Sequence, residues 1–240
     1  MIQVLDHGYC KLIESWGSDE RIIESARMST AKGFQGWGPK EDGSPGDEKL
    51  LRFLYEHKHM TPFEMAGMTI EVQAPIMVFR EWHRHRTQSY NEMSGRYTEL
   101  PDLYYIPSIE RLMAGKQAVK NKQSSEEGFT EFDAQCHQAT IKAATFFARD
   151  AYENLLKDGV SRELARLVLP VNQYSRMRAS ANLRNWLAFL TLRLDTSAQW
   201  EIQRYAQVVH KILKEKFPRT MELFDESKSG EKLTWHGLLE

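Results

Sequence analysis

Short apolar runs separated by turn residues dominate the first part of the chain. Residues 2–6 and 10–17 are rich in apolar and β-branched side chains, and His7 and Gly8 lie between them, which predicts a β-hairpin. Residues 68–73 alternate apolar and polar positions, the period of a half-buried strand. The sequence therefore predicts a sheet that is mostly antiparallel.

Helix signals separate these strands. Ser18 precedes two acidic residues, which is typical of a helix N-terminus, and apolar positions at helical spacing continue to Arg27. Asp47 is expected to cap a second helix, and Pro75 is expected to begin a third helix that continues through Trp82.

The strongest helical pattern runs from Phe129 to about Leu156. Its apolar residues recur every three to four positions, so we expect one stripe that faces the core, with Cys136 buried in it. The stripe consists of Phe129, Phe132, Cys136, Ala139, Ala143, Phe146 and Ala151. Further helices are predicted at residues 161–170, 182–193 and 198–217.

The glycine-rich residues 33–46 and the polar residues 113–128 predict loops, neither of them long enough to separate two domains. The glycine spacing matches no dinucleotide-binding or phosphate-binding fingerprint. We therefore expect a single α+β domain over residues 1–240, with a mostly antiparallel sheet flanked by long helices.

The composition of the 240 residues, 41% hydrophobic and 27% charged, is ordinary for a globular protein. The longest apolar run, residues 74–79, is far shorter than the ~20 residues that span a bilayer, and no secretory signal is expected. Two cysteines, Cys10 and Cys136, exclude a disulfide scaffold and a cysteine-rich zinc site. The expectation is a cytoplasmic protein with no membrane contact.

Arginine is unevenly distributed along the chain. The net charge of −1 argues against a general attraction for nucleic acid, yet residues 162–193 contain six arginines, no lysine and one acid. Four more arginines lie in residues 80–97, REWHRHRTQSYNEMSGRY. Planar guanidinium groups bind phosphate or carboxylate through paired hydrogen bonds, but composition alone is equally compatible with structural ion pairs.

Two chemical interpretations of residues 80–97 are disfavoured. A metal site would use the His-x-His pairs at residues 57–59 and 83–85. Positions i and i+2 of a helix point apart, and the interleaved arginines oppose a cation, so we expect no metal. Nucleophilic catalysis would need an activating base beside Ser94, and neither cysteine is near an arginine cluster in sequence.

Two other interpretations stay open on the residues alone. The first is RNA binding, in which arginines contact phosphates and aromatic rings stack on bases. It would use Arg84, Arg86, Arg96, Trp82, Tyr90 and Tyr97. The second, which the near-neutral charge favours, is a small-molecule site for anionic nucleotides, lined by both arginine-rich stretches. The edges of the nucleotide rings would form hydrogen bonds with Asn91, Glu92 and Asn182.

One motif makes the nucleotide interpretation more specific. Arg84-His85-Arg86, followed after seven residues by Ser94, resembles the RHR-x7-S signature of the flavin-dependent thymidylate synthases. The resemblance runs nearly end to end. Its further blocks are SARMS (25–29), HKHMTPFE (57–64), NEMSGRY (91–97), ELARLVLP (163–170), NLRNWLAFLTLR (182–193) and AQWEIQ (198–203).

This resemblance implies a homotetramer with FAD between subunits and NADPH as the reductant of FAD. The methylene group of methylenetetrahydrofolate would pass to dUMP, giving dTMP and tetrahydrofolate, with no nucleic acid as partner. The residues expected to hold FAD are Thr61, Arg84, His85, Arg86, Glu92, Asn182 and Arg184. Those expected around dUMP are Glu81, Arg84, Glu92, Met93, Ser94, Gly95, Arg96, Arg166 and Arg193.

Arg193 is the expected catalytic residue. Its permanent charge would stabilise negative charge on N3 and O2 of uracil, which makes C5 nucleophilic. The chain departs from the family pattern at Glu81, where some members have glutamine, and at Ala188 and Ser197, where asparagine and histidine occur. A carboxylate is unfavourable beside a phosphate, so Glu81 is expected to pair with an arginine or to point to the base.

Overall fold

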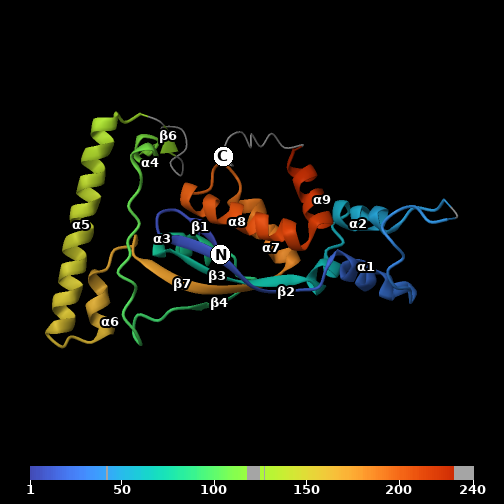
Figure 1. Cartoon of the computed structure of the whole chain (residues 1–240), viewed down its shortest axis with the longest axis horizontal. Helices are drawn as coiled ribbons and strands as arrows, with labels where there is room; N and C mark the ends of the chain where they lie inside the picture. Colours follow the sequence, from blue (N-terminus) through green and yellow to red (C-terminus); the bar gives the residue numbers. More distant parts are fainter. Residues whose placement is uncertain (42, 118–124, 127, 230–240) are drawn as a thin grey trace.

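A five-stranded antiparallel sheet carries the fold. The computed structural model describes residues 1–41, 43–117, 125–126 and 128–229. The strand order is β1-β2-β3-β7-β4, and helices cover one face of the sheet (Figure 1). The strands are β1 (Ile2–Val4), β2 (Gly8–Trp16), β3 (Gly67–Pro75), β4 (Ser89–Glu92) and β7 (Tyr174–Asn182). The predicted α+β class, with its mostly antiparallel sheet and flanking helices, is confirmed.

The predicted hairpin is confirmed, since β1 and β2 pair antiparallel with Val4 opposite Gly8. The predicted strand at residues 68–73 is β3, the middle strand of the sheet. The sequence analysis missed β7, which pairs with β3 along its whole length. Its arginines, Arg176 and Arg178, are exposed and alternate with buried Met177 and Ala179, so they mark the open face of the sheet.

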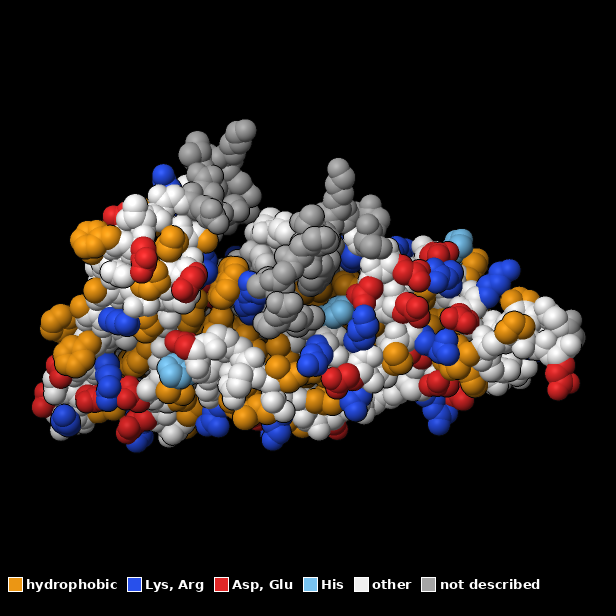
Figure 2. Space-filling view, turned by 45° about the horizontal axis from the view of Figure 1, so that its top comes forward, with side chains coloured by type: hydrophobic (Ala, Val, Ile, Leu, Met, Phe, Trp, Pro, Cys, Tyr) orange, Lys and Arg blue, Asp and Glu red, His pale blue; other side chains and the backbone are white. Residues whose placement is uncertain are grey.

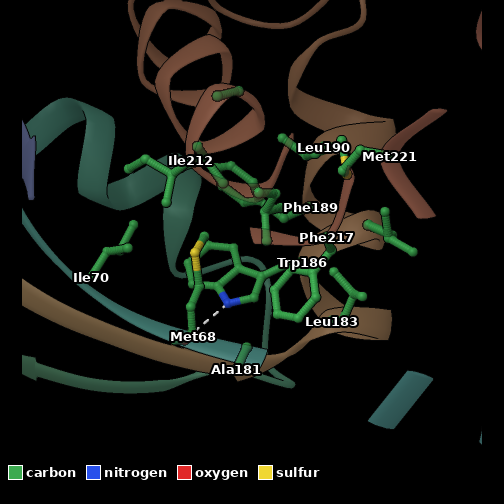
Figure 3. Packing of buried hydrophobic residues seen from close by; sticks show 14 of the residues in the cluster. Met68, Ile70, Ala181, Leu183, Trp186, Phe189, Leu190, Ile212, Phe217 and Met221 are labelled. Carbon is green, nitrogen blue, oxygen red and sulfur yellow. Dashed lines mark hydrogen bonds between the residues drawn. The ribbon is translucent and has the colours of Figure 1, made fainter. Parts of the chain in front are cut away.

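The opposite face of the sheet packs against the helices that follow β3 and β7. These are α3 (Ile76–Trp82), α7 (Leu183–Arg193), α8 (Trp200–Lys216) and α9 (Pro218–Ser229). Trp186 of α7 is fully buried, and its Nε1 donates to the Met68 carbonyl of β3 at 3.1 Å (Figure 3). The core is therefore tied to the sheet by a hydrogen bond as well as by packing. The last helix, α9, has no counterpart in the sequence analysis.

Two further helices cover the end of the sheet where β3 begins: α1 (Asp19–Arg27) and α2 (Asp47–Glu56). The Ser18 cap is confirmed, because its Oγ accepts from the Arg21 amide. The prediction that Asp47 caps α2 is wrong. Gly46 occupies the cap position, and the buried Asp47 carboxylate accepts instead from the guanidinium of Arg27 and from the Gln35 amide.

The long helix α5 (Glu131–Lys157) forms where the pattern predicted it, but its apolar stripe does not face the core. Phe132 is 73% exposed, Phe146 is 63% exposed and Cys136 is exposed. The helix instead buries Thr145 and Tyr152. It stands at one end of the molecule, where the described residues cover only one of its sides, and apolar side chains gather at that end (Figures 1 and 2).

The remaining elements are short. They are α4 (Ile109–Met113), α6 (Arg162–Ala165), β5 (Lys116–Gln117), β6 (Ser125–Glu126) and the 3-10 helices η1 (Met28–Thr30), η2 (Thr61–Met65) and η3 (Arg166–Val168). The helix expected at residues 161–170 is thus divided between α6 and η3. Much of the linker expected at residues 113–128 lies outside the described residues. Within the described ranges, no helix has the length and apolar character needed to cross a bilayer.

Asp19 gives a test of how the helices are held together. It is 3% exposed, and burial raises the pKa of its carboxyl, which accepts from the Arg219 and Thr220 amides and from the Thr220 hydroxyl. Asp19→Ala should destabilise the protein by about 2–4 kcal/mol, because it leaves buried donors of α9 unpaired. Denaturant unfolding measures this. The control Glu24→Ala, which removes an exposed partner of Arg21, should cost less than about 1 kcal/mol. Equal losses in the two variants would contradict the assignment.

Candidate functional site

The turn that follows α3 carries the Arg84-His85-Arg86 motif, and Tyr90 of β4 anchors it. The Tyr90 hydroxyl donates to the carbonyls of Trp82 (3.1 Å) and His85 (2.7 Å). Burial raises the pKa of Tyr90 to about 12, so the hydroxyl stays protonated and able to donate at neutral pH. The anchored turn exposes Arg84 and Arg86 and buries the imidazole of His85.

Arg193, the last residue of α7, reaches this turn. Its guanidinium donates from Nε to His85 Nε2 (2.8 Å), from Nη1 to Glu81 Oε2 (2.9 Å) and from Nη2 to the Glu81 carbonyl (2.8 Å). The Arg193 side chain is 13% exposed. We call Glu81, His85 and Arg193 the Arg193 cluster. The expectation that Glu81 pairs with an arginine is confirmed.

The Glu81 carbonyl lies in the last turn of α3, and the amide four residues further on does not donate to it, because the His85 amide donates to the Trp82 carbonyl instead. The Glu81 carbonyl accepts both from the Arg193 guanidinium and from the Arg84 amide, at 3.4 Å. Arg193 therefore acts as a side-chain cap of α3, and the two arginine-rich stretches of the sequence meet at one oxygen atom. The backbone of Arg84 and the guanidinium of Arg193 are therefore neighbours within a single chain, and a shared ligand site for the two stretches stays a prediction.

His85 is neutral in this arrangement. Burial, and next the nearby Arg193 charge, lower its pKa from 6.5 to about 4. Only a neutral imidazole keeps a lone pair on Nε2, so the hydrogen bond from Arg193 requires the tautomer with its proton on Nδ1. The ring packs edge-on against Phe189, with centroids 4.9 Å apart.

The residues expected to hold the cofactor lie around the beginning of α7 and the same turn. Asn182 caps α7 by accepting from the Asn185 amide (3.0 Å), and Asn185 Nδ2 donates to the Thr87 carbonyl (3.1 Å). Arg184 pairs with Glu64 at 2.5 Å. Glu64 lies in η2, which begins with the exposed Thr61. Among the described residues, Arg84 and Arg86 have no ion-pair partner.

A second group of predicted site residues lies where β4 ends. The Met93 amide donates to the Arg176 carbonyl (2.8 Å), and the Arg96 amide donates to Ser94 Oγ (3.3 Å). The Arg96 side chain pairs with Glu163 of α6 (3.1 Å). The buried Gly95 lies close to the Arg166 side chain, which is exposed.

The predicted dUMP residues thus form two groups in one chain. Glu81 and Arg84 adjoin Arg193, whereas Met93, Ser94, Gly95, Arg96 and Arg166 form the second group. Glu92 is exposed at the end of β4 and lies opposite Met177 of β7. The Met177 sulfur in turn contacts the His83 ring. No hydrogen bond or ion pair among the described residues joins Arg166 to the Arg193 cluster.

Several residues that shape the site were not singled out for these roles from sequence. Phe189 supports His85, Asn185 ties α7 to the turn, and Met177 contacts His83. In the sequence, these residues could be recognised by the periodicity of apolar positions in helices and strands. For residues 174–182 that alternation was not interpreted as a strand. Tyr90 and Trp82 had been considered as rings that stack on RNA bases, but Trp82 is fully buried and the Tyr90 hydroxyl is engaged. The RNA interpretation loses two of its aromatic contacts.

In the described part of the chain, no group of three or more His, Cys, Asp or Glu side chains could hold a metal ion. The chemistry that the geometry offers is electrostatic. A permanently charged guanidinium with little solvent access and a fixed orientation can stabilise negative charge that develops on a neighbouring ligand.

Comparison with known proteins gives a consistent result. The sequence model of the family described as "Thymidylate synthase complementing protein" matches residues 11–219. The flavin-dependent thymidylate synthase of Thermus thermophilus is 40% identical over 225 residues, which cover 94% of this chain and 78% of that protein. The enzyme of the same name from Thermosipho africanus is 40% identical and covers 92% of each chain.

A solved structure is also similar. The crystal structure of a UMP/dUMP methylase, PolB from Streptomyces cacaoi, bound with 5-Br dUMP, superposes with a TM-score of 0.81 at 31% identity. The match covers 94% of this chain and 97% of that one. Fold, motif and overall sequence agree, and this chain belongs to the flavin-dependent thymidylate synthase family.

Proposed function

We propose that this protein converts dUMP to dTMP, with methylenetetrahydrofolate as carbon donor and NADPH as the source of reducing equivalents. The observation that carries the proposal is the Arg193 cluster, in a chain that matches the family over residues 11–219. The cytoplasmic location expected from the sequence stays a prediction.

The donor set suits FAD, which carries a pyrophosphate and a polar flavin ring. Arg84 and Arg86 offer exposed guanidinium groups without carboxylate partners in the described residues, as a polyanion requires. The Asn182 Oδ1 atom is used by the helix cap, which leaves its amide group to donate. We propose that FAD is held by Thr61, Arg84, His85, Arg86, Glu92, Asn182 and Arg184. When bound and reduced, FAD supplies hydride.

The uracil nucleotide is proposed to lie beside Arg193. The guanidinium would stabilise negative charge on N3 and O2, so that C5 becomes nucleophilic toward the methylene group. Arg193 acts by its field and hydrogen bonds and transfers no proton, since a guanidinium does not deprotonate in proteins. Ser94, Gly95, Arg96 and Arg166 would bind the rest of the nucleotide, its phosphate included.

Neither cysteine is suited to activate uracil by addition. Cys10 is completely buried on β2, and burial raises the pKa of its thiol, which suppresses the thiolate. Cys136 is exposed on α5, away from the Arg193 cluster. A route in which flavin supplies hydride requires no nucleophilic cysteine, which agrees with this arrangement.

We propose a homotetramer in which one chain completes the site of another. Two features support it. Among the described residues, no hydrogen bond or ion pair links Arg166 to the Arg193 cluster, and a second copy would bring the two together. The apolar face of α5, which we define as Phe132, Phe146 and Phe147, is 63–73% exposed, and large apolar patches of this kind mark interfaces.

Arg193→Ala tests the catalytic assignment. Tritium release from C5-labelled dUMP, with folate, NADPH and FAD present, should fall by at least about 100-fold, because a charged donor to the developing anion is lost. Flavin absorbance should be retained, since the proposed FAD residues are intact. Arg21→Ala, an exposed arginine of α1, is the matched control and should keep full activity. An Arg193→Ala variant with normal turnover would remove Arg193 from its proposed role.

Phe146→Glu tests the assembly. A carboxylate on the apolar face of α5 would be desolvated on association, so light scattering after size-exclusion chromatography should show species smaller than the tetramer. Lys49→Glu is the control, because it adds the same carboxylate at an exposed position of α2, at the other end of the molecule from α5 (Figure 1). It should leave the assembly intact. A Phe146→Glu variant that remains tetrameric would exclude this face from the interface.

A further inference from the structure

The hydrogen bonds of Arg193 determine which of its donors remain for a ligand. A guanidinium has five N–H groups, one on Nε and two on each terminal nitrogen. His85 takes the Nε donor, the Glu81 carboxylate takes one on Nη1 and the Glu81 carbonyl takes one on Nη2. One N–H on each terminal nitrogen is left for a ligand.

Glu81 holds Arg193 through two parts of the same residue. Its carbonyl position is fixed by α3, and its carboxylate closes onto Nη1 at 2.9 Å, so the guanidinium plane is held at two points. The carboxylate is occupied by this contact, although its side chain is 40% exposed. A carboxylate that neutralises part of the Arg193 charge is badly placed to approach an anionic nucleotide as well.

His85 fixes the third point. Its imidazole packs against Phe189, and its carbonyl accepts from the Tyr90 hydroxyl, so both ring and backbone are immobilised. The charged groups next to the ring are the Arg193 guanidinium and, paired with it, the Glu81 carboxylate. Burial, and next the Arg193 charge, lower the pKa of the imidazole, which therefore stays neutral and able to accept.

From these contacts we propose that Glu81 and His85 are positioning residues that hold Arg193 in one orientation, with one N–H on each terminal nitrogen aimed at the substrate, and that Glu81 does not contact the nucleotide. The inference rests on the proposed function for the identity of the substrate. It replaces the sequence-based expectation that Glu81 surrounds dUMP. The advantage for catalysis is preorganisation, because an oriented donor needs no rearrangement when negative charge develops.

A double-mutant cycle separates positioning from direct contact. Glu81→Ala should lower the rate of tritium release from C5-labelled dUMP by about 10- to 100-fold, the range for losing a hydrogen bond to a charged group, with unchanged flavin content. In the Arg193→Ala background, adding Glu81→Ala should change the dUMP dissociation constant by less than about twofold, because a residue that acts through Arg193 has nothing left to position. If Glu81→Ala weakens dUMP binding by the same factor in both backgrounds, Glu81 contacts the nucleotide and the proposal is overturned.

Conservative variants protect the test against a simple folding defect. Glu81→Gln keeps an acceptor for Nη1 and should retain the rate to within about threefold, whereas a loss as large as that of Glu81→Ala would overturn the positioning role. His85→Phe keeps an aromatic ring against Phe189 but removes the acceptor, so kcat should fall more than the KM for dUMP changes. Glu24→Ala, which removes the carboxylate of an exposed arginine pair on α1, is the matched control and should have wild-type kinetics.

A stability cycle distinguishes failure of this inference from failure of the proposed function. If the wild-type protein releases no tritium, the proposed function fails, and the contact is then judged from melting temperatures without nucleotide. The Glu81→Ala and Arg193→Ala shifts should be non-additive, with the double variant losing less than the sum of the two. Additive shifts would overturn the inference whatever the activity.

Discussion

The arrangement of the site depends on how one charged group is accommodated with little water around it. A guanidinium at 13% exposure needs hydrogen-bond acceptors on most of its donors, because burying an unpaired charge is costly. Arg193 finds them at the end of α3, where the Glu81 carbonyl lacks the usual i+4 amide and accepts from the guanidinium. The guanidinium needs acceptors and the Glu81 carbonyl needs a donor, so one hydrogen bond serves both. This contact holds together α3, α7 and the turn at residues 83–88.

The sheet determines where the Arg193 guanidinium contacts the end of α3. Strand β7 ends at Asn182, whose side chain caps α7, so the helix begins at a position fixed by the pairing of β7 with β3. The hydrogen bond from Trp186 to the Met68 carbonyl holds α7 against the sheet. Arg193 lies about 10 residues further on, at the C-terminal end of α7, where a positive charge also interacts favourably with the helix dipole.

Sequence patterns predicted the elements that depend only on residues close together in the chain. The hairpin, strand β3, the Ser18 cap and the long helix α5 follow from alternation, spacing and capping residues. For Glu81, the repulsion between a carboxylate and the phosphate implied by the resemblance left two alternatives, an arginine partner or an orientation toward the base, and the structure shows the arginine partner. The packing partner of a helix face is not local information. The α5 stripe has the periodicity of a core face, but its Phe132 and Phe146 are not covered by any part of the chain that the structure describes. Strand β7 was missed because its exposed arginines were considered only as ligands for anions, although they alternate with buried Met177 and Ala179 as a half-buried strand requires.

The structure also separates three kinds of arginine that composition could not distinguish. Arg27 and Arg111 pair with the buried carboxylates of Asp47 and Glu201, so they hold the fold together. Arg96 and Arg184 pair with partly exposed acids, and such surface pairs contribute only about 0–1 kcal/mol. A phosphate can therefore replace these carboxylates at small cost. Arg84, Arg86 and Arg166 have no carboxylate partner among the described residues, which leaves uncompensated positive charge on a chain whose net charge is −1. This local imbalance favours anionic ligands at the places where the RHR-x7-S motif and the arginines of the C-terminal half lie.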